Sequence, residues 1–196
     1  MTHRECDTAP STVDAVPLDE VARAKLPSPR LEEPSAQAFR HVLGHYPTGV
    51  AVITGMTSAG PVGMAVNSFT SVSLDPPAVL FCPAHSSSTW PQLRTARHLA
   101  INILSNAQHE VSQRFASRQV DRFADTQWSR GTMGAPLLEG ALGWIECSIE
   151  SEVPVGDHTV VIASVQQLGK HANVEDPLIF FRGGYLSGVA AAIVNE

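Results

Sequence analysis

A succession of short, strand-like segments limits the fold of this chain more than any other feature. Alternating or continuously apolar runs cover residues 49–56, 62–69, 78–82, 99–104, 142–153, 158–168 and 178–182. Turn-forming residues separate them, as at residues 58–61 and at Gly156 and Asp157. Few helical patterns interrupt these runs. We therefore expect a mainly β protein, a small antiparallel barrel with flanking helices, in preference to a doubly wound sheet.

Three helices are expected between the strands, over residues 35–45, 89–95 and 107–117. Ser35 and Asn106 can cap the first and the third, because their side chains can accept a hydrogen bond from the first helical turn. The first helix places three apolar side chains on one face, Phe39, Val42 and Leu43. Residues 121–140 are expected to be irregular.

The length of 196 residues suits one domain with a buried core. Residues 1–34 are rich in Pro, Ala, Asp and Glu and show no sustained periodicity, which predicts a poorly ordered N-terminal extension. An arm that packs on a partner subunit is the alternative. Residues 35–196 are expected to form the folded domain.

The charge of the chain excludes some kinds of partner. A formal net charge of -6 and a pI of about 5.7 argue against nucleic acid, which usually binds a basic face. No run approaches the roughly 18 apolar residues that a membrane span needs. The N-terminus lacks the apolar core of a signal peptide. These observations predict a cytoplasmic protein that binds no membrane.

The three cysteines, Cys6, Cys82 and Cys147, fit neither a disulfide framework nor a zinc site, because their number is odd and no C-x-x-C spacing occurs. Cys82 and Cys147 fall in strand-like runs, where buried thiols behave as small apolar side chains. We expect no metal site.

Residues 63–77, GMAVNSFTSVSLDPP, begin as a strand and pass into hydroxyl and amide side chains before a Pro-Pro pair. A strand end that turns polar in this way can hold a polar ligand. The chain has no G-x-G-x-x-G, no P-loop and no G-x-S-x-G motif. Any nucleotide must therefore be held by other means.

This stretch and several others resemble, in order and spacing, the motifs of the short-chain flavin reductase family. Between Phe39 and Tyr185 they are FRHVLGHYPTGVAVIT, GMAVNSFTSVSLDPP, SSST, INIL, QRFA, DRF, GAPLLEGAL, GDH and PLIFFRGGY. The resemblance implies an antiparallel split β-barrel of the FMN-binding type. It also implies an NAD(P)H:flavin oxidoreductase that passes a hydride from NADH to FAD or FMN and releases reduced flavin to a partner monooxygenase or halogenase. The flavin site of this fold is usually built at a dimer interface, so the resemblance implies a homodimer.

The resemblance also implies which residues bind the two nucleotides. They are Tyr46, Pro47, Thr48, Met64, Ala65, Val66, Asn67, Ser68, Ser71, Cys82, Ser86, Ser87, Ser88, Thr89, Asn102, Ile103, Leu104, Arg114, Phe115, His158, Arg182, Gly183, Gly184 and Tyr185. The short polar side chains and backbone amides of residues 66–71 can bond the rim of a flavin ring. A solvated strand end is the alternative for that run, and a core strand is the alternative for residues 102–104.

Residues 86–89 place hydroxyl groups before a short helix, as suits a phosphate; a simple helix cap is the alternative. No Lys or Arg lies within this run, although His85 stands nearby. We therefore expect neutral donors to bind the phosphate, assisted by Arg114, and the flavin to be held weakly.

His158 follows the turn at Gly156 and Asp157, where it can reach a cleft. By the resemblance it lies beside the nicotinamide and is the residue expected to position it. The alternative is a turn histidine paired with Asp157. Residues 182–185 offer glycines for close approach and a tyrosine ring for stacking. No arginine cluster near Gly183 calls for the 2′-phosphate of NADPH, so NADH is preferred.

Two other functions share the same barrel. A flavin-binding or storage module would lack a working reductant site, which makes His158 and Tyr185 the residues that discriminate it from a reductase. An oxidase of the pyridoxamine-phosphate type would need a strongly basic phosphate pocket, which the neutral SSST run disfavours.

Overall fold

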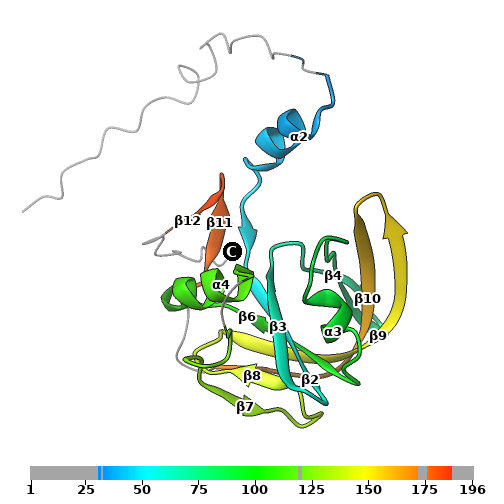
Figure 1. Ribbon diagram of the computed structural model, residues 1–196, viewed down its shortest axis with the longest axis vertical. Coiled ribbons are helices and arrows are strands. Elements are labelled where there is room, and N and C mark those ends of the chain that lie inside the picture. The colour runs from blue at the N-terminus through cyan, green and yellow to red at the C-terminus, as the bar shows by residue number, and fades with distance from the viewer. Residues whose placement is uncertain (1–30, 32, 119–120, 172–175, 187–196) are drawn as a thin grey trace, which may run out of the picture.

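The computed structural model describes residues 31, 33–118, 121–171 and 176–186 of the chain (Figure 1). The N-terminal extension predicted for residues 1–34 lies almost entirely outside the described residues. Across the described ranges the chain is mostly strand, in antiparallel sheets. The predicted mainly β fold is confirmed. Among the same residues, no helix is both long enough and apolar enough to cross a membrane.

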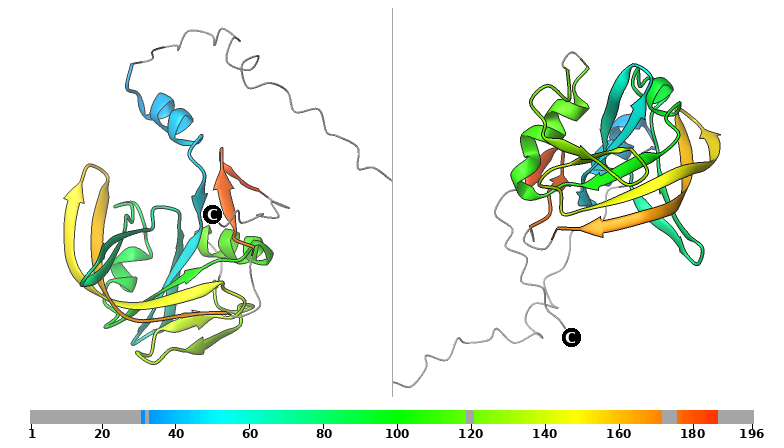
Figure 2. Two further views of the ribbon diagram at one scale, coloured as in Figure 1. Left: turned by 180° about the vertical axis from the view of Figure 1, so that it is seen from behind. Right: turned by 90° about the horizontal axis from the view of Figure 1, so that it is seen from below.

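One antiparallel sheet forms the body of the described part of the chain. In spatial order its strands are β3 (Gly60–Val66), β2 (Ala51–Thr57), β6 (Leu99–Ile103), β9 (Gly143–Val155), β10 (His158–Lys170), β5 (Pro77–Phe81) and β4 (Thr70–Leu74). The register between β9 and β10 shifts twice, and such bulges bend a strand. The sheet accordingly curls around an interior, as the views in Figures 1 and 2 show. Its two outer strands, β3 and β4, do not pair with one another.

A serine hydroxyl extends the pairing of β4 with β5. The amide N–H of Cys82, just after β5, donates to Ser68 Oγ at 2.9 Å. Ser68 Oγ in turn donates to the carbonyl of Cys82 at 3.5 Å. In the antiparallel register of β4 and β5, Ser68 lies opposite Cys82, so this contact fixes the segment between β3 and β4 to the end of β5. The flavin contacts expected of both residues stay a prediction.

Two smaller antiparallel sheets complete the described strands. One contains β1 (Thr48–Gly49), β11 (Ile179–Phe181) and β12 (Gly184–Leu186), and the other contains β7 (Trp128–Arg130) and β8 (Pro136–Leu138). Val50 alone separates β1 from β2, so the chain passes directly from one sheet into the next.

The described helices are α2 (Ala36–Leu43), α3 (Trp90–Leu93), α4 (His109–Ala116) and the short 3-10 turn η1 (Asn106–Gln108). Ser35 caps α2 as predicted, since Ser35 Oγ accepts from the amide of Ala38 at 3.1 Å. The cap predicted at Asn106 is wrong. Ser105 takes that position in a capping box with Gln108, because the Gln108 side chain reaches back to the Ser105 amide.

The core lies on both sides of β2 and β6. Inside the barrel, Ile53 and Ile101 pack with Phe81 from β5. On the outer face, Val52 and Leu104 pack with Phe115 of α4 and with neighbours from β8 and the start of β11. Burial on both faces explains why β2 carries apolar side chains at successive positions, Val52 and Ile53.

Of the two cysteines that the structure describes, only Cys147 is fully buried. Burial raises the pKa of its thiol to about 12, and the adjacent Glu146 carboxylate adds to the rise. Cys82 is only partly buried, which corrects the expectation for that residue. Cys6 lies outside the described residues.

Four strands were not predicted. β4 was missed because Thr70 to Leu74 looked like a polar extension of β3, and only its pairing with β5 makes it a strand. β7 and β8 fall within the stretch expected to be irregular, and β12 follows the predicted end of the chain's last strand. All four have five or fewer residues and lack an apolar run as long as those by which the equally short β5 and β6 were predicted.

The apolar face of α2 does not pack on the barrel. None of its residues is buried, and Phe39 and Val42 are 63% and 65% exposed. Figure 1 shows α2 standing away from the curled sheet, above β11 and β12. The end of α2 is hydrogen-bonded to the β11–β12 turn, where the amide of Arg182 donates to the carbonyl of Gly44 at 2.9 Å.

Candidate functional site

Three adjoining pockets lie along the open edge of β3 and beyond the end of that strand at Asn67. We name them the α2 pocket, of about 730 Å³, the middle pocket, of about 180 Å³, and the serine pocket, of about 210 Å³. The α2 and middle pockets share Asn67 and Phe180, and the middle and serine pockets share Ala65 and Ala116. The three therefore form one row, which most of the predicted site residues line.

The α2 pocket lies between the helix α2, the β11–β12 turn and the β9–β10 turn. It is lined by Ala36, Phe39, Arg40, Leu43, Gly44, Tyr46, Thr48, Asn67, Asp157, His158, Phe180, Arg182 and Gly183. The predicted contacts Tyr46, Thr48, His158 and Gly183 thus meet in one cavity, although they are spread over the length of the domain.

His158 and Asp157 form a hydrogen-bonded pair on one wall of the α2 pocket. His158 Nδ1 lies 2.7 Å from Asp157 Oδ1. Because a carboxylate can only accept, Nδ1 carries the proton and Nε2 remains for another group. The hydrogen bond from His158 lowers the pKa of Asp157 below its ordinary value of 3.8, and the charge of His158 adds to this. Asp157 therefore stays ionised at neutral pH and fixes the tautomer of His158.

The position of this pair is set by the backbone. Gly156, with φ +57°, and Asp157 make the two-residue turn between β9 and β10. The amide of His85 donates to the Asp157 carbonyl at 2.8 Å, and Ala84 bridges to His158. The segment after β5 thus holds the turn beside the pocket.

Thr48 supplies an unsatisfied group in the same pocket. Its Oγ1 is a buried side-chain oxygen without a hydrogen-bond partner among the residues that the structure describes. Buried hydroxyls are normally satisfied, and an exception at a pocket wall calls for an explanation.

The middle pocket is narrow and mostly apolar. It is lined by Val50, Ala65, Val66, Asn67, Ser112, Ala116, Phe180 and Tyr185. The hydroxyl groups of Tyr185 and Ser112 lie 2.7 Å apart, which joins β12 to α4. The rings of Tyr185 and Phe180 meet edge to face at 5.6 Å. These contacts fix Tyr185 as one wall.

The edge of β3 faces this row of pockets with open backbone groups. The carbonyl of Gly63 points away from β2, since it accepts a hydrogen bond from Arg122 at 2.9 Å. Strand residues two apart direct their backbone groups to the same side. The N–H and C=O of Ala65 therefore also point toward the pockets, where they can bond the edge of a flat heteroaromatic ring.

The serine pocket contains the SSST run and two arginines. It is lined by Met64, Ala65, Ala84, Ser86, Ser87, Ser88, Thr89, Phe115, Ala116, Arg118 and Arg122. Ser87 Oγ accepts from the amides of Thr89 and Trp90, so this hydroxyl caps α3. Ser86 and Ser88 are exposed at the pocket. The cap and the candidate phosphate donors are therefore different members of one run.

Arg122 links the segments around the serine pocket by hydrogen bonds. Its guanidinium donates to the carbonyls of Gly63 and Ser117 and to Thr89 Oγ1. These bonds join β3, the end of α4 and the SSST run at one point. Burial lowers the pKa of Arg122 below its ordinary value, but an arginine in a protein remains a cation at neutral pH.

The cation expected at the phosphate end is not Arg114. Arg114 Nη1 donates to Thr126 Oγ1 at 3.2 Å, and Nη2 lies 4.0 Å from Asp125 Oδ2. Arg114 lines none of the three pockets, whereas Arg118, just beyond the end of α4, is exposed in the serine pocket. The structure thus places Arg118, and not Arg114, beside the neutral donors of the SSST run.

Several other predicted contacts also lie outside the three pockets, namely Pro47, Ser68, Ser71, Cys82, Asn102, Ile103, Leu104 and Gly184. β6 is an inner strand, paired on both sides. The backbone of Leu104 is used by Val50 and Leu178, and the Asn102 side chain donates to the Val52 carbonyl. The burial of Asn102 and Leu104 favours the alternative of a core strand, and the flavin contacts expected of residues 102–104 stay a prediction.

Sequence reasoning missed several residues that line the row, among them Arg40, Ser112, Arg118, Arg122 and Phe180. Arg122 stands in the DRF motif, which was noticed but given no role. The others lie in motifs or in and beside helices, and the sequence does not show which way their side chains point. No spacing rule links them to the SSST run or to His158.

Cations thus lie at both ends of the row and apolar walls lie in its middle. Such a cleft fits flat rings that carry phosphate tails, since guanidinium groups and hydroxyls suit phosphate and apolar walls suit a ring. Within the described ranges, no group of three or more His, Cys, Asp or Glu side chains could hold a metal ion.

Known proteins support this interpretation. Residues 43–188 match the family model described as a flavin reductase like domain. A flavin reductase of Pseudomonas putida is 46% identical over 156 residues, which cover 79% of this chain and 91% of that protein. The reductase subunit HsaB of a flavin-dependent monooxygenase of Mycobacterium tuberculosis is 41% identical over 150 residues, covering 76% and 80%.

Solved structures agree with the sequences. The NADH:FAD oxidoreductase SgcE6 of Streptomyces globisporus superposes with a TM-score of 0.77 at 34% identity, over 84% of this chain and all of that one. The split-barrel fold predicted from the resemblance is thereby confirmed. The chain belongs to the flavin reductase like family.

Proposed function

We propose that this protein is an NADH-dependent flavin reductase. It would pass a hydride from the nicotinamide C4 to the flavin N5 of FMN or FAD, so that both reacting atoms belong to the bound nucleotides. The observation that carries the proposal is the row of pockets along β3, with arginines at one end and the Asp157–His158 pair at the other. The contribution of the protein is to align the two rings.

The flavin fits the serine and middle pockets. Arg118 and the hydroxyls of Ser86 and Ser88 would bind its phosphate, while Arg122 holds their loop in place. The ring would lie in the middle pocket, with its edge on the backbone of Ala65 and Asn67. The neutral SSST run no longer argues against a pyridoxamine-phosphate oxidase, because arginines are present; the family match is what decides against it.

The nicotinamide fits the α2 pocket, beside His158. With Nδ1 bonded to Asp157, His158 Nε2 can accept a hydrogen bond from the carboxamide. This arrangement favours a reductase over a flavin-storage module, because a storage module needs no second site for a nicotinamide ring.

The test is to mix the purified protein with NADH or NADPH and with FMN, FAD or riboflavin in air. Loss of NADH absorbance is expected only when flavin is added. His158→Ala should raise the KM for NADH about tenfold, the effect of one lost hydrogen bond, and leave the KM for flavin unchanged. Absence of NADH loss with every flavin would refute the reductase, and an unchanged KM for NADH in His158→Ala would refute the nicotinamide position.

The phosphate position is tested with flavins that differ only in their tail. Arg118→Ala should raise the KM for FMN about tenfold or more, the effect of a lost charge-assisted hydrogen bond, while riboflavin is reduced as before. Arg114→Ala is the matched control, since its guanidinium bonds Thr126 and Asp125 instead. A larger effect of Arg114→Ala than of Arg118→Ala would restore the assignment made from the sequence.

The oligomer and the physiological partner extend the proposal. An oxygenase or halogenase would receive the reduced flavin by diffusion, as the names of relatives suggest.

Exposed apolar side chains on α2 and β4, with Leu74 90% exposed, support a homodimer. The cytoplasmic location stays a prediction from the sequence.

The dimer is tested by size-exclusion chromatography with light scattering. The expected mass is twice the 20.9 kDa of one chain, and Leu74→Glu should shift the protein toward monomer, because it places a charge in the buried interface. A monomer at micromolar concentration in the unmodified protein would contradict this part of the proposal.

A further inference from the structure

Arg182 occupies a backbone position that is unfavourable for arginine. Together with Gly183 it makes the two-residue turn between β11 and β12, with φ of +50° at Arg182 and +82° at Gly183. Such turns need positive φ at both positions and select Asn, Asp or Gly at the first. Within the described ranges Arg182 is the sole residue other than glycine with positive φ. Strain of this kind persists mainly where a side chain has a function.

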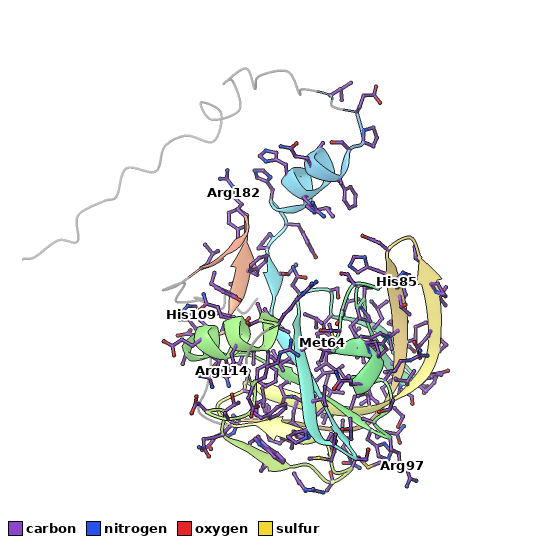
Figure 3. All side chains as sticks on the ribbon, in the orientation of Figure 1. Met64, His85, Arg97, His109, Arg114 and Arg182 are labelled. Carbon is purple, nitrogen blue, oxygen red and sulfur yellow. The ribbon has the colours of Figure 1, made fainter. Side chains whose placement is uncertain are left out.

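The side chain of Arg182 lines the α2 pocket. Its backbone amide is bonded to Gly44 at the end of α2, and Figure 3 shows Arg182 at the tip of the β11–β12 hairpin, beside that helix. Arg40, from the last turn of α2, lines the same pocket. The hydrogen bonds and ion pairs found among the described residues satisfy neither guanidinium group.

We infer that Arg40 and Arg182 form a phosphate-binding subsite for the nicotinamide dinucleotide. The inference rests on the proposed function, since it assumes that the ring lies beside His158. His158 and the two arginines line one cavity of about 730 Å³. The phosphates of the dinucleotide are attached through the ribose beyond the ring, so a ligand anchored at His158 extends its phosphates into the rest of that cavity.

Charge favours this occupant. Guanidinium groups bind phosphate by paired hydrogen bonds, and two of them match the two negative charges of a pyrophosphate. Asp157 is the one acidic side chain lining the α2 pocket, and it is already bonded to His158. In a chain of net charge -6, a pocket with two unpaired arginines attracts an anionic ligand.

The subsite changes the expectation about the 2′-phosphate. NADH was preferred because no arginine cluster surrounds Gly183 in the sequence. The fold supplies the second arginine from α2, far along the chain. The phosphate bound by the pair can be the pyrophosphate, common to NADH and NADPH, or the 2′-phosphate of NADPH.

The experiment compares Arg182→Asn, Arg182→Lys and Arg40→Ala with Arg97→Ala as control. Arg97 is exposed and lines none of the three pockets, and it lies at the far end of the molecule from Arg182 (Figure 3). KM and kcat are measured with NADH and with NADPH, and KM with FMN and with FAD. Inhibition by ADP-ribose, which keeps the pyrophosphate without the nicotinamide, reports binding independently of hydride transfer. Thermal unfolding is recorded for each variant.

We expect Arg182→Asn and Arg40→Ala to raise the KM for reduced nicotinamide nucleotide about tenfold or more, the effect of a lost charge-assisted hydrogen bond, with kcat and the KM for FMN unchanged. An equal rise for NADH and NADPH, with lost ADP-ribose inhibition, assigns the pyrophosphate. A rise for NADPH alone assigns the 2′-phosphate. Arg182→Lys should keep part of the affinity. Arg182→Asn should unfold at the same or a higher temperature, because Asn suits the turn.

The subsite is refuted if the unmodified protein oxidises NADH but Arg182→Asn and Arg40→Ala leave both nucleotide KM values unchanged. A rise in KM for FAD and not for NADH would refute it too, by assigning the pair to the flavin's pyrophosphate. Marked loss of thermal stability in Arg182→Asn would show that the arginine is retained for folding. A protein that oxidises neither nucleotide would instead refute the proposed function.

Discussion

The open edge of β3 is the constraint on which the site depends. The main sheet curls but does not close, because β3 and β4 do not pair, and the edge of β3 is left with backbone groups that need partners. Arg122 satisfies the carbonyl of Gly63, and Ser68, just beyond the end of β3, is bonded to Cys82. Between these two points the backbone groups of Ala65 face the pockets. The fold thus prepares a hydrogen-bonding edge for a ligand and uses side chains to fix the segments on either side of it.

The remaining site residues come from segments far apart in the chain. α4 supplies the wall of the middle pocket through Ser112, and the β11–β12 hairpin supplies Tyr185. The β9–β10 turn brings His158 to the far end. Two arginines that belong to different motifs meet in the α2 pocket, and two others meet the SSST run. The distribution of charge in the cleft is therefore a property of the fold and cannot be judged from the net charge of the chain.

The sequence predicted the barrel and most of the row of pockets. Strands such as β2, β9 and β10 were recognisable, since their apolar patterns are long enough to show a period. The compact motifs also predicted residues that line the row, since the SSST run and His158 both lie there. β4 was missed because its polar residues become a strand only through pairing, and the burial of β6 could not be predicted because it depends on both of its neighbours.

The cation at the phosphate end of the cleft could not be predicted from the sequence either. No Lys or Arg lies within residues 86–89, and Arg114 was the cation expected to assist there. The direction of a side chain at the end of a helix decides the matter: Arg114 turns to Asp125, while Arg118 reaches the pocket. The expectation of a weakly held flavin lost its main support with this correction, since it rested on the missing cation.

The central claim is that the cleft aligns a nicotinamide ring with a flavin ring. The most direct test uses NADH that carries deuterium on one face or on the other face of C4, oxidised by the protein in the presence of FMN. Mass spectrometry of the NAD product then measures the deuterium that remains. Alignment predicts that one isotopomer loses its deuterium and the other retains it. Equal loss from both faces would contradict the account, because it would mean that the protein does not orient the ring.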